Sequence, residues 1–325
     1  MEKIRIGVIG LGEAATKIHI PRLRLTPEMA LIAVADLSEE KVNRTRSMIR
    51  GIKGYTNYVR LCERKDVDAI FVLTPPASHC EICTVAAENG KYIFCEKPIA
   101  TSVKEAKKMI ERVRKTHTLL MIGSVMRFAQ NMVLFKKFLK FIGSDLEAKT
   151  IYRSYLPNTG DTFRYDYKRG GGALFETGTH HINLLRWFFG EGTPVSVDMK
   201  IEMGVDILTI FSLQFENGTQ THTEISWRSK VAQNAIEVRG SNGYVKTDFT
   251  TAPKLTVNCS LSNIFRKAGD LTVVLTGGKD AYFREIDHFV SCIRNEQYPL
   301  TSGEEALRDL QLVLDIYSKG DISLE

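Results

Sequence analysis

The sequence predicts an α/β domain built on a doubly wound parallel sheet, followed by an α+β domain with a large, mostly antiparallel sheet. Three observations lead to this prediction. The chain has 325 residues, a length typical of about two domains. Apolar, β-branched runs alternate with helical patterns through residues 1–123, whereas later runs alternate apolar and polar residues. We therefore expect one domain over residues 1–123 and a second over residues 124–325.

The first domain is expected to contain five strands connected by helices. Its apolar runs cover residues 4–9, 31–35, 69–73, 92–95 and 119–122. Ser78 is placed to open a helix that ends before Gly90, and Ser102 with Glu105 forms a capping box at the start of another helix. Strands that alternate with helices of this length form right-handed βαβ units, so the sheet should be parallel.

The second domain is expected to contain several strands and a few helices. Odd-numbered residues from Ile207 to Phe215 share one strand face, and Asn217-Gly218 is typical of a hairpin turn. Further strands are expected near residues 227, 236–238, 244–247 and 255–257, and helices near 132–141, after 172, and over 283–295 and 303–317.

The opposite face of the strand over residues 207–215 is also partly apolar, through Leu208 and Ile210. Such a face is covered either by a second subunit or by the loops of its own chain. The sequence leaves both alternatives open. If a subunit covers it, the protein is a homo-oligomer, a dimer or tetramer, that assembles through the C-terminal sheet.

Composition favours a folded protein without a nucleic-acid or membrane partner. The chain has 44 Lys and Arg against 38 Asp and Glu, a formal net charge of +6, and most basic residues stand close to acids. No apolar run reaches the roughly 18 residues that cross a membrane. The six cysteines lack the spacing of a disulfide framework, which favours a reducing cytoplasm. Cys80 and Cys83 lack further zinc ligands nearby, so we expect no metal.

A glycine-rich turn follows the first predicted strand and opens a helix. It reads Gly10-Leu11-Gly12-Glu13-Ala14-Ala15, a GxGxxA pattern. Gly10 permits the tight turn, Gly12 lets the backbone approach a pyrophosphate, and Ala15 keeps helix and strand close. The N–H groups of the helix N-terminus then face the phosphates. The pattern predicts a dinucleotide-binding Rossmann domain, in which Glu13 and Ala14 also contact the cofactor.

Asp36 bears on which dinucleotide is bound. It ends the second predicted strand, where a carboxylate accepts hydrogen bonds from ribose hydroxyls. A carboxylate also repels a 2′-phosphate, and Leu37 follows it at a position where NADP enzymes often carry arginine. We therefore expect NAD, with Leu37 among the cofactor contacts. Lys41 and Arg44 on the next helix keep NADP as an alternative.

Further motifs resemble the glucose–fructose oxidoreductase, inositol dehydrogenase and MocA family of dehydrogenases, in matching order over nearly the whole chain. They are Thr74-Pro75-Pro76-Ala77-Ser78-His79, Cys95-Glu96-Lys97-Pro98-Ile99-Ala100, Arg127-Phe128, Gly170-Gly171-Gly172 through Glu176 to His180, and Tyr282 with Glu285 and Phe289. The Glu-Lys-Pro and Gly-Gly-xxx-acid-xxx-His elements are together highly specific.

The resemblance implies that Lys97 is catalytic, where composition alone would favour a surface lysine beside a turn proline. A lysine at the carboxyl end of a strand can stabilise a developing alkoxide. The resemblance also implies a frequently cis Pro98 and a set of cofactor contacts, which are Thr74, Pro75, His79, Glu96, Lys97, Arg127 and Tyr282. For His79, a plain helix-start role beside Ser78 is at least as good an interpretation.

Glu176 and His180 are four residues apart, which on a helical turn places both side chains on one face. An imidazole beside a carboxylate is a proton-transfer pair that works near neutral pH. The family resemblance makes both residues catalytic. Two positions depart from the family pattern: Glu176 stands where aspartate is usual, and Asn183 replaces an acid. The longer side chain moves the carboxylate by about 1.5 Å, and misplacement of that order matters for positioned catalysis.

Residues 158–169 form a loop dense in polar and aromatic groups, which in the resembled family leads to the substrate. Arg164 and Tyr165, together with Lys97, Glu176 and His180, are therefore the candidate substrate contacts, and a solvated loop explains the loop residues equally well. The resemblance implies an NAD(P)-dependent oxidoreductase acting on a secondary alcohol or ketone of a sugar, inositol or related polyol. The alternatives are a non-catalytic dinucleotide-binding regulator and an NADPH-dependent reductase of keto-sugars or sugar nucleotides.

Overall fold

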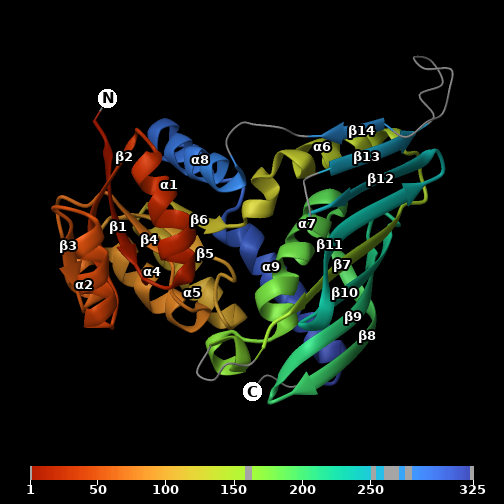
Figure 1. Cartoon of the computed structure of the whole chain (residues 1–325), viewed down its shortest axis with the longest axis horizontal. Coiled ribbons are helices and arrows are strands. Elements are labelled where there is room, and N and C mark those ends of the chain that lie inside the picture. The colour runs from red at the N-terminus through yellow and green to blue at the C-terminus, as the bar shows by residue number, and fades with distance from the viewer. Residues whose placement is uncertain (1, 158–162, 250–253, 260–270, 275–279, 323–325) are drawn as a thin grey trace. The chain divides into compact units, whose positions relative to one another are not determined.

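The structure is a computed structural model (Figure 1), and it describes residues 2–157, 163–249, 254–259, 271–274 and 280–322. The chain divides into two compact units. The first comprises Met1–Val125 with Lys279–Leu310, and the second comprises Met126–Gly278 with Gln311–Glu325. Each unit contains one sheet with helices packed on it. No helix within the described ranges is long and apolar enough to cross a membrane.

The first unit contains a six-stranded sheet in the order β3-β2-β1-β4-β5-β6, in which every neighbouring pair is parallel. This confirms the doubly wound α/β prediction. The strands are β1 (Ile4–Ile9), β2 (Met29–Ala35), β3 (Lys53–Tyr55), β4 (Ala69–Val72), β5 (Tyr92–Glu96) and β6 (Leu120–Gly123). Only the three-residue strand β3 was not predicted, because it is too short and polar to form an apolar run.

Helices connect these strands, as the alternating pattern predicts. They are the π-helix η1 (Ala14–His19), α1 (Ile20–Leu25), α2 (Glu39–Met48), α3 (Tyr58–Cys62), α4 (His79–Glu88) and α5 (Val103–Lys115). The predicted cap of α5 is present, since the Ser102 side chain accepts a hydrogen bond from the Glu105 N–H at 3.3 Å. Ser78 precedes α4 but makes no such bond, because its hydroxyl donates to the loop before it, at Pro75 O.

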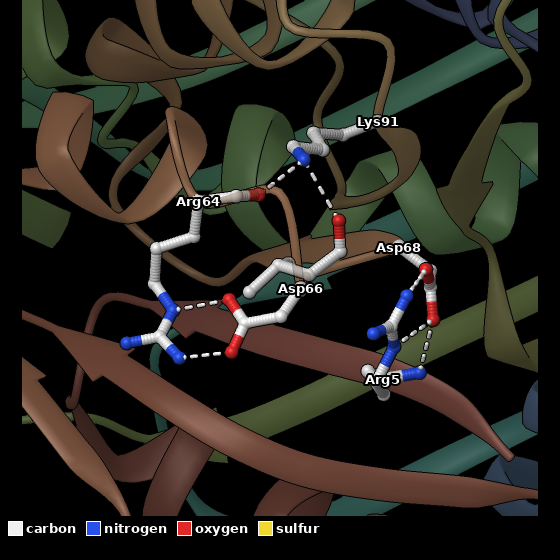
Figure 2. A network of polar contacts seen from close by, with 6 residues as sticks. Arg5, Arg64, Asp66, Asp68 and Lys91 are labelled. Atoms are coloured by element: carbon white, nitrogen blue, oxygen red, sulfur yellow. Dashed lines mark hydrogen bonds and ion pairs between the residues drawn. The ribbon is translucent and has the colours of Figure 1, made fainter.

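Charged side chains form a network at the amino ends of the strands (Figure 2). The Arg5 guanidinium donates to both carboxylate oxygens of Asp68, at 2.9 and 2.7 Å. Arg64 donates to Asp66 at 2.9 Å, and the ammonium of Lys91 donates to the carbonyl oxygens of Arg64 and Val67 at 2.6 and 2.7 Å. These contacts fix the loop that enters β4.

Helix α8 (Ala281–Asn295) belongs to the first unit, although the predicted second domain over residues 124–325 includes it. Its Phe289 packs edge-on against Phe71 of β4 and Phe94 of β5, with ring centroids 5.4 and 5.8 Å apart. At its start, Asp280 accepts a hydrogen bond at 2.9 Å from Arg22 of α1, and Figure 1 shows α8 beside α1. Helix α8, which is far along the chain, thus packs against the aromatic side chains of β4 and β5.

The second unit contains an eight-stranded sheet in the order β14-β13-β12-β11-β7-β10-β9-β8. Only β7 and β10 are parallel neighbours within the described residues, which confirms the mostly antiparallel prediction. The strands are β7 (Glu147–Tyr155), β8 (Gly192–Glu202), β9 (Val205–Phe215), β10 (Gln220–Ser226), β11 (Arg228–Gly240), β12 (Gly243–Asp248), β13 (Lys254–Cys259) and β14 (Leu271–Val274).

One face of this sheet is buried under helices. The odd-numbered residues Ile207–Phe215 of β9 are all buried, as their alternation predicts, whereas Leu208 and Ile210 on the opposite face are half-buried. In Figure 1, helix α7 (Thr179–Phe189) lies along the strands, and its last residue, Phe189, packs on Phe215 of β9. The helices of this unit are α6 (Gln130–Phe138), the π-helix η7 (Ala173–Gly178), α7 (Thr179–Phe189) and the end of α9 (Gly303–Lys319).

Candidate active site

The glycine turn lies at the carboxyl end of β1. Gly10 has φ +91°, and an added Cβ would lie 2.8 Å from the carbonyl carbon of Leu73, so only glycine fits. A Cβ on Gly12 would meet nothing within 4 Å, which leaves the space that a pyrophosphate requires. Ala15 is fully buried against the sheet, and Glu13 is exposed and pairs with Lys17. The turn therefore fits a dinucleotide at the N-terminus of η1.

Asp36 directly follows β2, beside the glycine turn. Its two carboxylate oxygens accept hydrogen bonds from the backbone N–H groups of Leu11, at 2.7 Å, and Ser38, at 2.9 Å. These bonds fix the carboxylate against the turn, while Leu37 next to it is 89% exposed. An anchored carboxylate at the end of the second strand fits the ribose-binding prediction.

The loops after β4 and β5 are tied together by His79. This side chain is fully buried, and its Nδ1 and Nε2 atoms lie 2.9 Å from Pro98 O and 2.8 Å from Thr74 O. Burial lowers the pKa of His79. Thr74 and Pro75 are half-buried at the same strand end, and the Lys97–Pro98 peptide is cis. His79 thus supports the two loops from inside, and it is also the first residue of α4.

Lys97 follows β5 and is half-buried. Its backbone N–H donates to Glu96 Oε2 at 3.1 Å, and Glu96 Oε1 lies 2.7 Å from Nε2 of His19. No local pattern in the sequence singles out His19, because its partner Glu96 is 77 residues away in the chain. Tyr282 packs edge-on against His19 at 5.8 Å, and burial raises the pKa of Tyr282 to about 12.

The second unit positions the segment that contains Glu176. Gly172, which precedes η7, has φ +106°, and an added Cβ would lie 2.3 Å from Oδ1 of Asp206. Asp206 is fully buried and accepts hydrogen bonds from the N–H of Leu174 at 2.7 Å and from the hydroxyls of Thr209 and Tyr317 at 2.8 and 2.6 Å. Burial raises the pKa of Asp206, while these bonds oppose that rise. This anchor has no local signal in the sequence, because its members are far apart in the chain.

Glu176 lies in the π-helix η7 and His180 in the α-helix α7, so the helical turn between them is not purely α-helical. A turn of a π-helix contains more residues than a turn of an α-helix, and a shared face for the two side chains stays a prediction. Glu176 Oε2 accepts from the Thr177 hydroxyl at 2.8 Å, and its Oε1 lies 3.4 Å from Nε of Arg164. Glu176 and His180 are both half-buried.

Other predicted contacts of the second unit serve packing as well. Arg127 is 3% exposed, and its Nε donates to Oδ1 of Asn183 at 3.0 Å, so Asn183 joins Arg127 to α7. The Tyr165 hydroxyl donates to Leu156 O at 2.7 Å and accepts from Arg228 at 3.2 Å. Residues 158–162 of the predicted substrate loop lie outside the described residues. Over the described ranges, no group of three His, Cys, Asp or Glu side chains is arranged to hold a metal.

The predicted site residues therefore fall into two groups, one in each unit. The first unit brings together the glycine turn, Asp36, Thr74, Glu96 and Lys97, and the second brings together Arg164 and Glu176 with Thr177. The glycine turn and the anchored Asp36 at the carboxyl edge of a parallel sheet are typical of a dinucleotide-binding Rossmann domain, and Lys97 lies two strands away at the same edge.

Comparison with known proteins identifies the family. Residues 4–124 match the model of the oxidoreductase family with an NAD-binding Rossmann fold, and residues 140–246 match the GFO/IDH/MocA C-terminal domain. The chain belongs to the Gfo/Idh/MocA oxidoreductase family and is an NAD(P)-dependent oxidoreductase of that family. This confirms the resemblance that its motifs indicate.

Similar proteins act on several classes of carbohydrate. The chain is 28% identical to myo-inositol 2-dehydrogenase of Thermotoga maritima, over 95% of this chain and 94% of that protein. It is 28% identical to dTDP-3,4-didehydro-2,6-dideoxy-alpha-D-glucose 3-reductase of Saccharopolyspora spinosa, over 77% of this chain and 76% of that protein. A 3-ketoreductase from Actinomadura kijaniata, crystallised with NADP and TDP-benzene, shares the fold with a TM-score of 0.87 at 23% identity, with 98% of each chain covered.

Proposed function

We propose that the protein transfers hydride between a nicotinamide cofactor and a secondary alcohol or ketone of a sugar, inositol or related polyol. The observation that carries this proposal is Lys97, a lysine anchored at the carboxyl end of β5 in the same unit as the glycine turn. An ammonium at this edge stabilises an oxygen on which negative charge develops. The similarity to myo-inositol 2-dehydrogenase supports a polyol as substrate.

The cofactor residues favour NAD. Gly10, Gly12 and Ala15 would hold the pyrophosphate, and Asp36 would hold the ribose of the adenosine. When bound, the nicotinamide supplies the hydride acceptor or donor. Because both oxygens of Asp36 are anchored by backbone N–H groups, the carboxylate cannot easily turn away from a 2′-phosphate. Leu37 offers no positive charge in compensation.

Three side chains divide the work at the substrate carbon. Lys97 would hold the reacting oxygen, and His180 would take the hydroxyl proton during oxidation and return it during reduction. Glu176 would orient the substrate, since its carboxylate is already held by Thr177 and lies near Arg164. A shifted substrate would accommodate the longer side chain of Glu176, compared with the aspartate usual in the family.

Arg164 and Glu176 form the part of the site suited to several hydroxyl groups. The Arg164 side chain is 35% exposed and that of Glu176 is 20% exposed, so both have polar atoms available to a ligand. A guanidinium donates and a carboxylate accepts, which suits adjacent hydroxyls of a polyol. Tyr165 has its hydroxyl engaged by Leu156 and Arg228 and would contact the substrate through its ring.

A second candidate is the reduction of a keto-sugar nucleotide. The 28% identity to the dTDP-sugar 3-reductase favours it, and a nucleotide diphosphate would suit the guanidinium of Arg164. The two candidate functions differ in the direction of hydride transfer, in the cofactor and in the size of the substrate.

A homo-oligomer through the C-terminal sheet is also part of the proposal. Ile151, Ile210 and Leu208 lie half-buried on the face that points away from the helices, beside the Arg153–Glu224 ion pair. The hollow on this face is lined by residues of β7 to β11, among them Lys149, His222 and Glu237. Light scattering of the wild type and of Ile210→Lys tests this, since the substitution should release monomers.

The function is tested by following absorbance of the reduced nicotinamide with a panel of inositols and aldoses, each with NAD and with NADP, and of dTDP-keto-sugars, each with NADH and with NADPH. Turnover with an inositol or aldose and NAD supports the proposal. Turnover only with a dTDP-keto-sugar and NADPH supports the second candidate. Binding of dinucleotide, measured by calorimetry, without turnover of any panel member would contradict both and leave a dinucleotide-binding regulator.

A further inference from the structure

A histidine is buried among aromatic rings inside the first unit, and the mechanism does not use it. His19 is fully buried at the end of η1, the helix that the glycine turn opens. Its ring packs edge-on against Phe94 and Tyr282, with centroids 5.5 and 5.8 Å apart, and lies 6.3 Å from that of Phe71. An imidazole in such surroundings is costly unless a polar partner holds it.

The partner of His19 is the residue that precedes the lysine. Nε2 of His19 lies 2.7 Å from Oε1 of Glu96, and the other carboxylate oxygen of Glu96 accepts the backbone N–H of Lys97 at 3.1 Å. One carboxylate thus joins the far end of the glycine-turn helix to the backbone of the lysine loop. These two segments are otherwise separated along the sheet by β4, which lies between β1 and β5.

A second carboxyl group interacts with this cluster. Glu285 of α8 is fully buried, and neither of its oxygens has a partner among the described residues. Burial, and then the charge of Glu96, raise the pKa of Glu285 well above its usual range. Glu96 is the carboxyl group that has donors, namely the Lys97 N–H and, in the tautomer with the proton on Nε2, the His19 ring.

We propose that His19 is a positioning residue that couples dinucleotide binding at the glycine turn to the placement of Lys97. A pyrophosphate at the N-terminus of η1 holds the helix whose last residue is His19. Because His19 holds Glu96 and Glu96 holds the Lys97 N–H, a fixed helix gives a fixed lysine loop. This inference rests on the proposed function only for the catalytic role of Lys97.

Two variants separate the hydrogen bond from the packing of the ring. His19→Phe keeps an aromatic ring against Phe94 and Tyr282 but removes the donor to Glu96. His19→Gln supplies an amide donor in place of Nε2. The matched control is His117→Gln, which removes an exposed histidine that does not contact Glu96.

The first readout is amide hydrogen exchange of peptides that cover residues 95–100, without cofactor and at saturating NAD or NADP. In the wild type and in His117→Gln, cofactor should slow exchange in this segment. In His19→Phe that slowing should be lost while peptides of the glycine turn stay protected, and His19→Gln should recover most of it. Full cofactor-induced protection of residues 95–100 in His19→Phe would overturn the proposal.

The second readout is steady-state kinetics with the substrate found in the panel. His19→Phe should lower kcat roughly 10- to 100-fold, the loss expected from a catalytic group misplaced by about 1 Å, with the KM for cofactor changed less than about threefold. An equal loss in His19→Gln would contradict the hydrogen-bond role. If His19→Phe does not fold, Glu96→Gln, which cannot accept from both donors, should show the same uncoupling, and intact coupling there overturns the proposal.

The two proposals fail in different ways. Absence of turnover in the wild type, with cofactor-induced protection of residues 95–100 still dependent on His19, rejects the proposed reaction and supports the coupling. Turnover in the wild type that His19→Phe leaves unchanged rejects the coupling alone.

Discussion

Two lysines flank the same strand of the first unit and differ in almost every other respect. Lys91 directly precedes β5 and is 5% exposed, and its ammonium donates to two backbone carbonyls beside the Arg5–Asp68 and Arg64–Asp66 pairs (Figure 2). Lys97 directly follows β5 and is half-buried at the end where the glycine turn lies.

The surroundings of the two lysines differ in how fully their polar groups are bonded. At the amino end, Arg5 satisfies both oxygens of Asp68 and Lys91 satisfies two carbonyls of the loop before β4. At the carboxyl end, Gly12 faces open space, and the buried Nδ1 of His19 and both oxygens of Glu285 have no partner among the described residues. Fully bonded groups stabilise the fold, whereas the open space beside Gly12 and the half-buried Lys97 suit binding and chemistry. Substitution of the lysine should therefore lower mainly the stability at the amino end of β5 and mainly the activity at its carboxyl end.

The largest effect is expected from Lys97→Met. It removes the cation that stabilises charge on the substrate oxygen, and loss of one such donor lowers kcat roughly 10²- to 10³-fold. The melting temperature should fall less than that of Lys91→Met, because Lys97 is half-buried at a strand end whereas Lys91 is 5% exposed. Initial rates and a thermal melt on the same sample measure both. A kcat within a factor of about two of the wild type would remove Lys97 from the reaction.

The next effect concerns cofactor choice at the end of β2. Asp36→Ser removes the negative charge but keeps a small acceptor for the N–H of Leu11. The ratio of NADP to NAD efficiency, as kcat/KM, should rise roughly tenfold or more, because a 2′-phosphate is no longer repelled. The variant Asp145→Ser, at an exposed loop in the other unit, is the matched control. If the ratio of NADP to NAD efficiency is equal in both variants, Asp36 does not recognise the ribose.

Lys91→Met should show the opposite pattern to Lys97→Met. Two buried carbonyl oxygens lose their donor, which costs about 1–3 kcal/mol of the free energy of unfolding. The kcat per folded molecule should be unchanged, because the site lies at the other end of β5. Urea unfolding together with active-site-normalised rates tests this. A loss of activity without a loss of stability would contradict the division between the two ends.

The smallest effect is the pH dependence of the Arg5–Asp68 pair. Burial alone would raise the pKa of Asp68, but the hydrogen bonds from the side chain and backbone of Arg5 hold it below its usual value. A carboxyl group with a lowered folded-state pKa stabilises the protein above its unfolded pKa, about 3.9, and loses this contribution as the pH falls. Asp68→Asn should thus cost about 0.5–1 kcal/mol at pH 7.

The same variant gives the control for that prediction. Its deficit in the free energy of unfolding, measured in urea from pH 7 downward, should shrink as the pH falls through the folded-state pKa of Asp68. A deficit that stays constant down to about pH 2.5 would show that the ion pair is not its source.

Much of the first unit could be predicted because its signals are local. The apolar runs of β1, β4 and β5 and the glycine turn each appear within ten residues, and the structure places them as expected. Strand β3 was missed because three half-exposed residues carry no pattern. The alternation in β9 likewise fixed which face is buried.

The supports of the site could not be predicted because they depend on tertiary contacts. The anchor at Asp206 needs Tyr317, more than a hundred residues away, and the bond between His19 and Glu96 crosses a strand. The π-helix over Ala173–Gly178 could not be predicted either, because a four-residue spacing of Glu176 and His180 does not distinguish it from an α-helix. The residues of the candidate site can be recognised from local sequence motifs, whereas the contacts that hold them in place are tertiary.

The central proposal is that Lys97 and His180 serve the same hydride-transfer reaction. A double-mutant cycle of Lys97→Met and His180→Ala, measured as kcat/KM with the substrate found in the panel, tests it most directly. When two groups stabilise one transition state, the effects of substituting them are strongly non-additive. The kcat/KM of the double variant should therefore lie within about threefold of that of the worse single variant. Losses that multiply across the cycle would mean that the two residues act independently and would contradict the account.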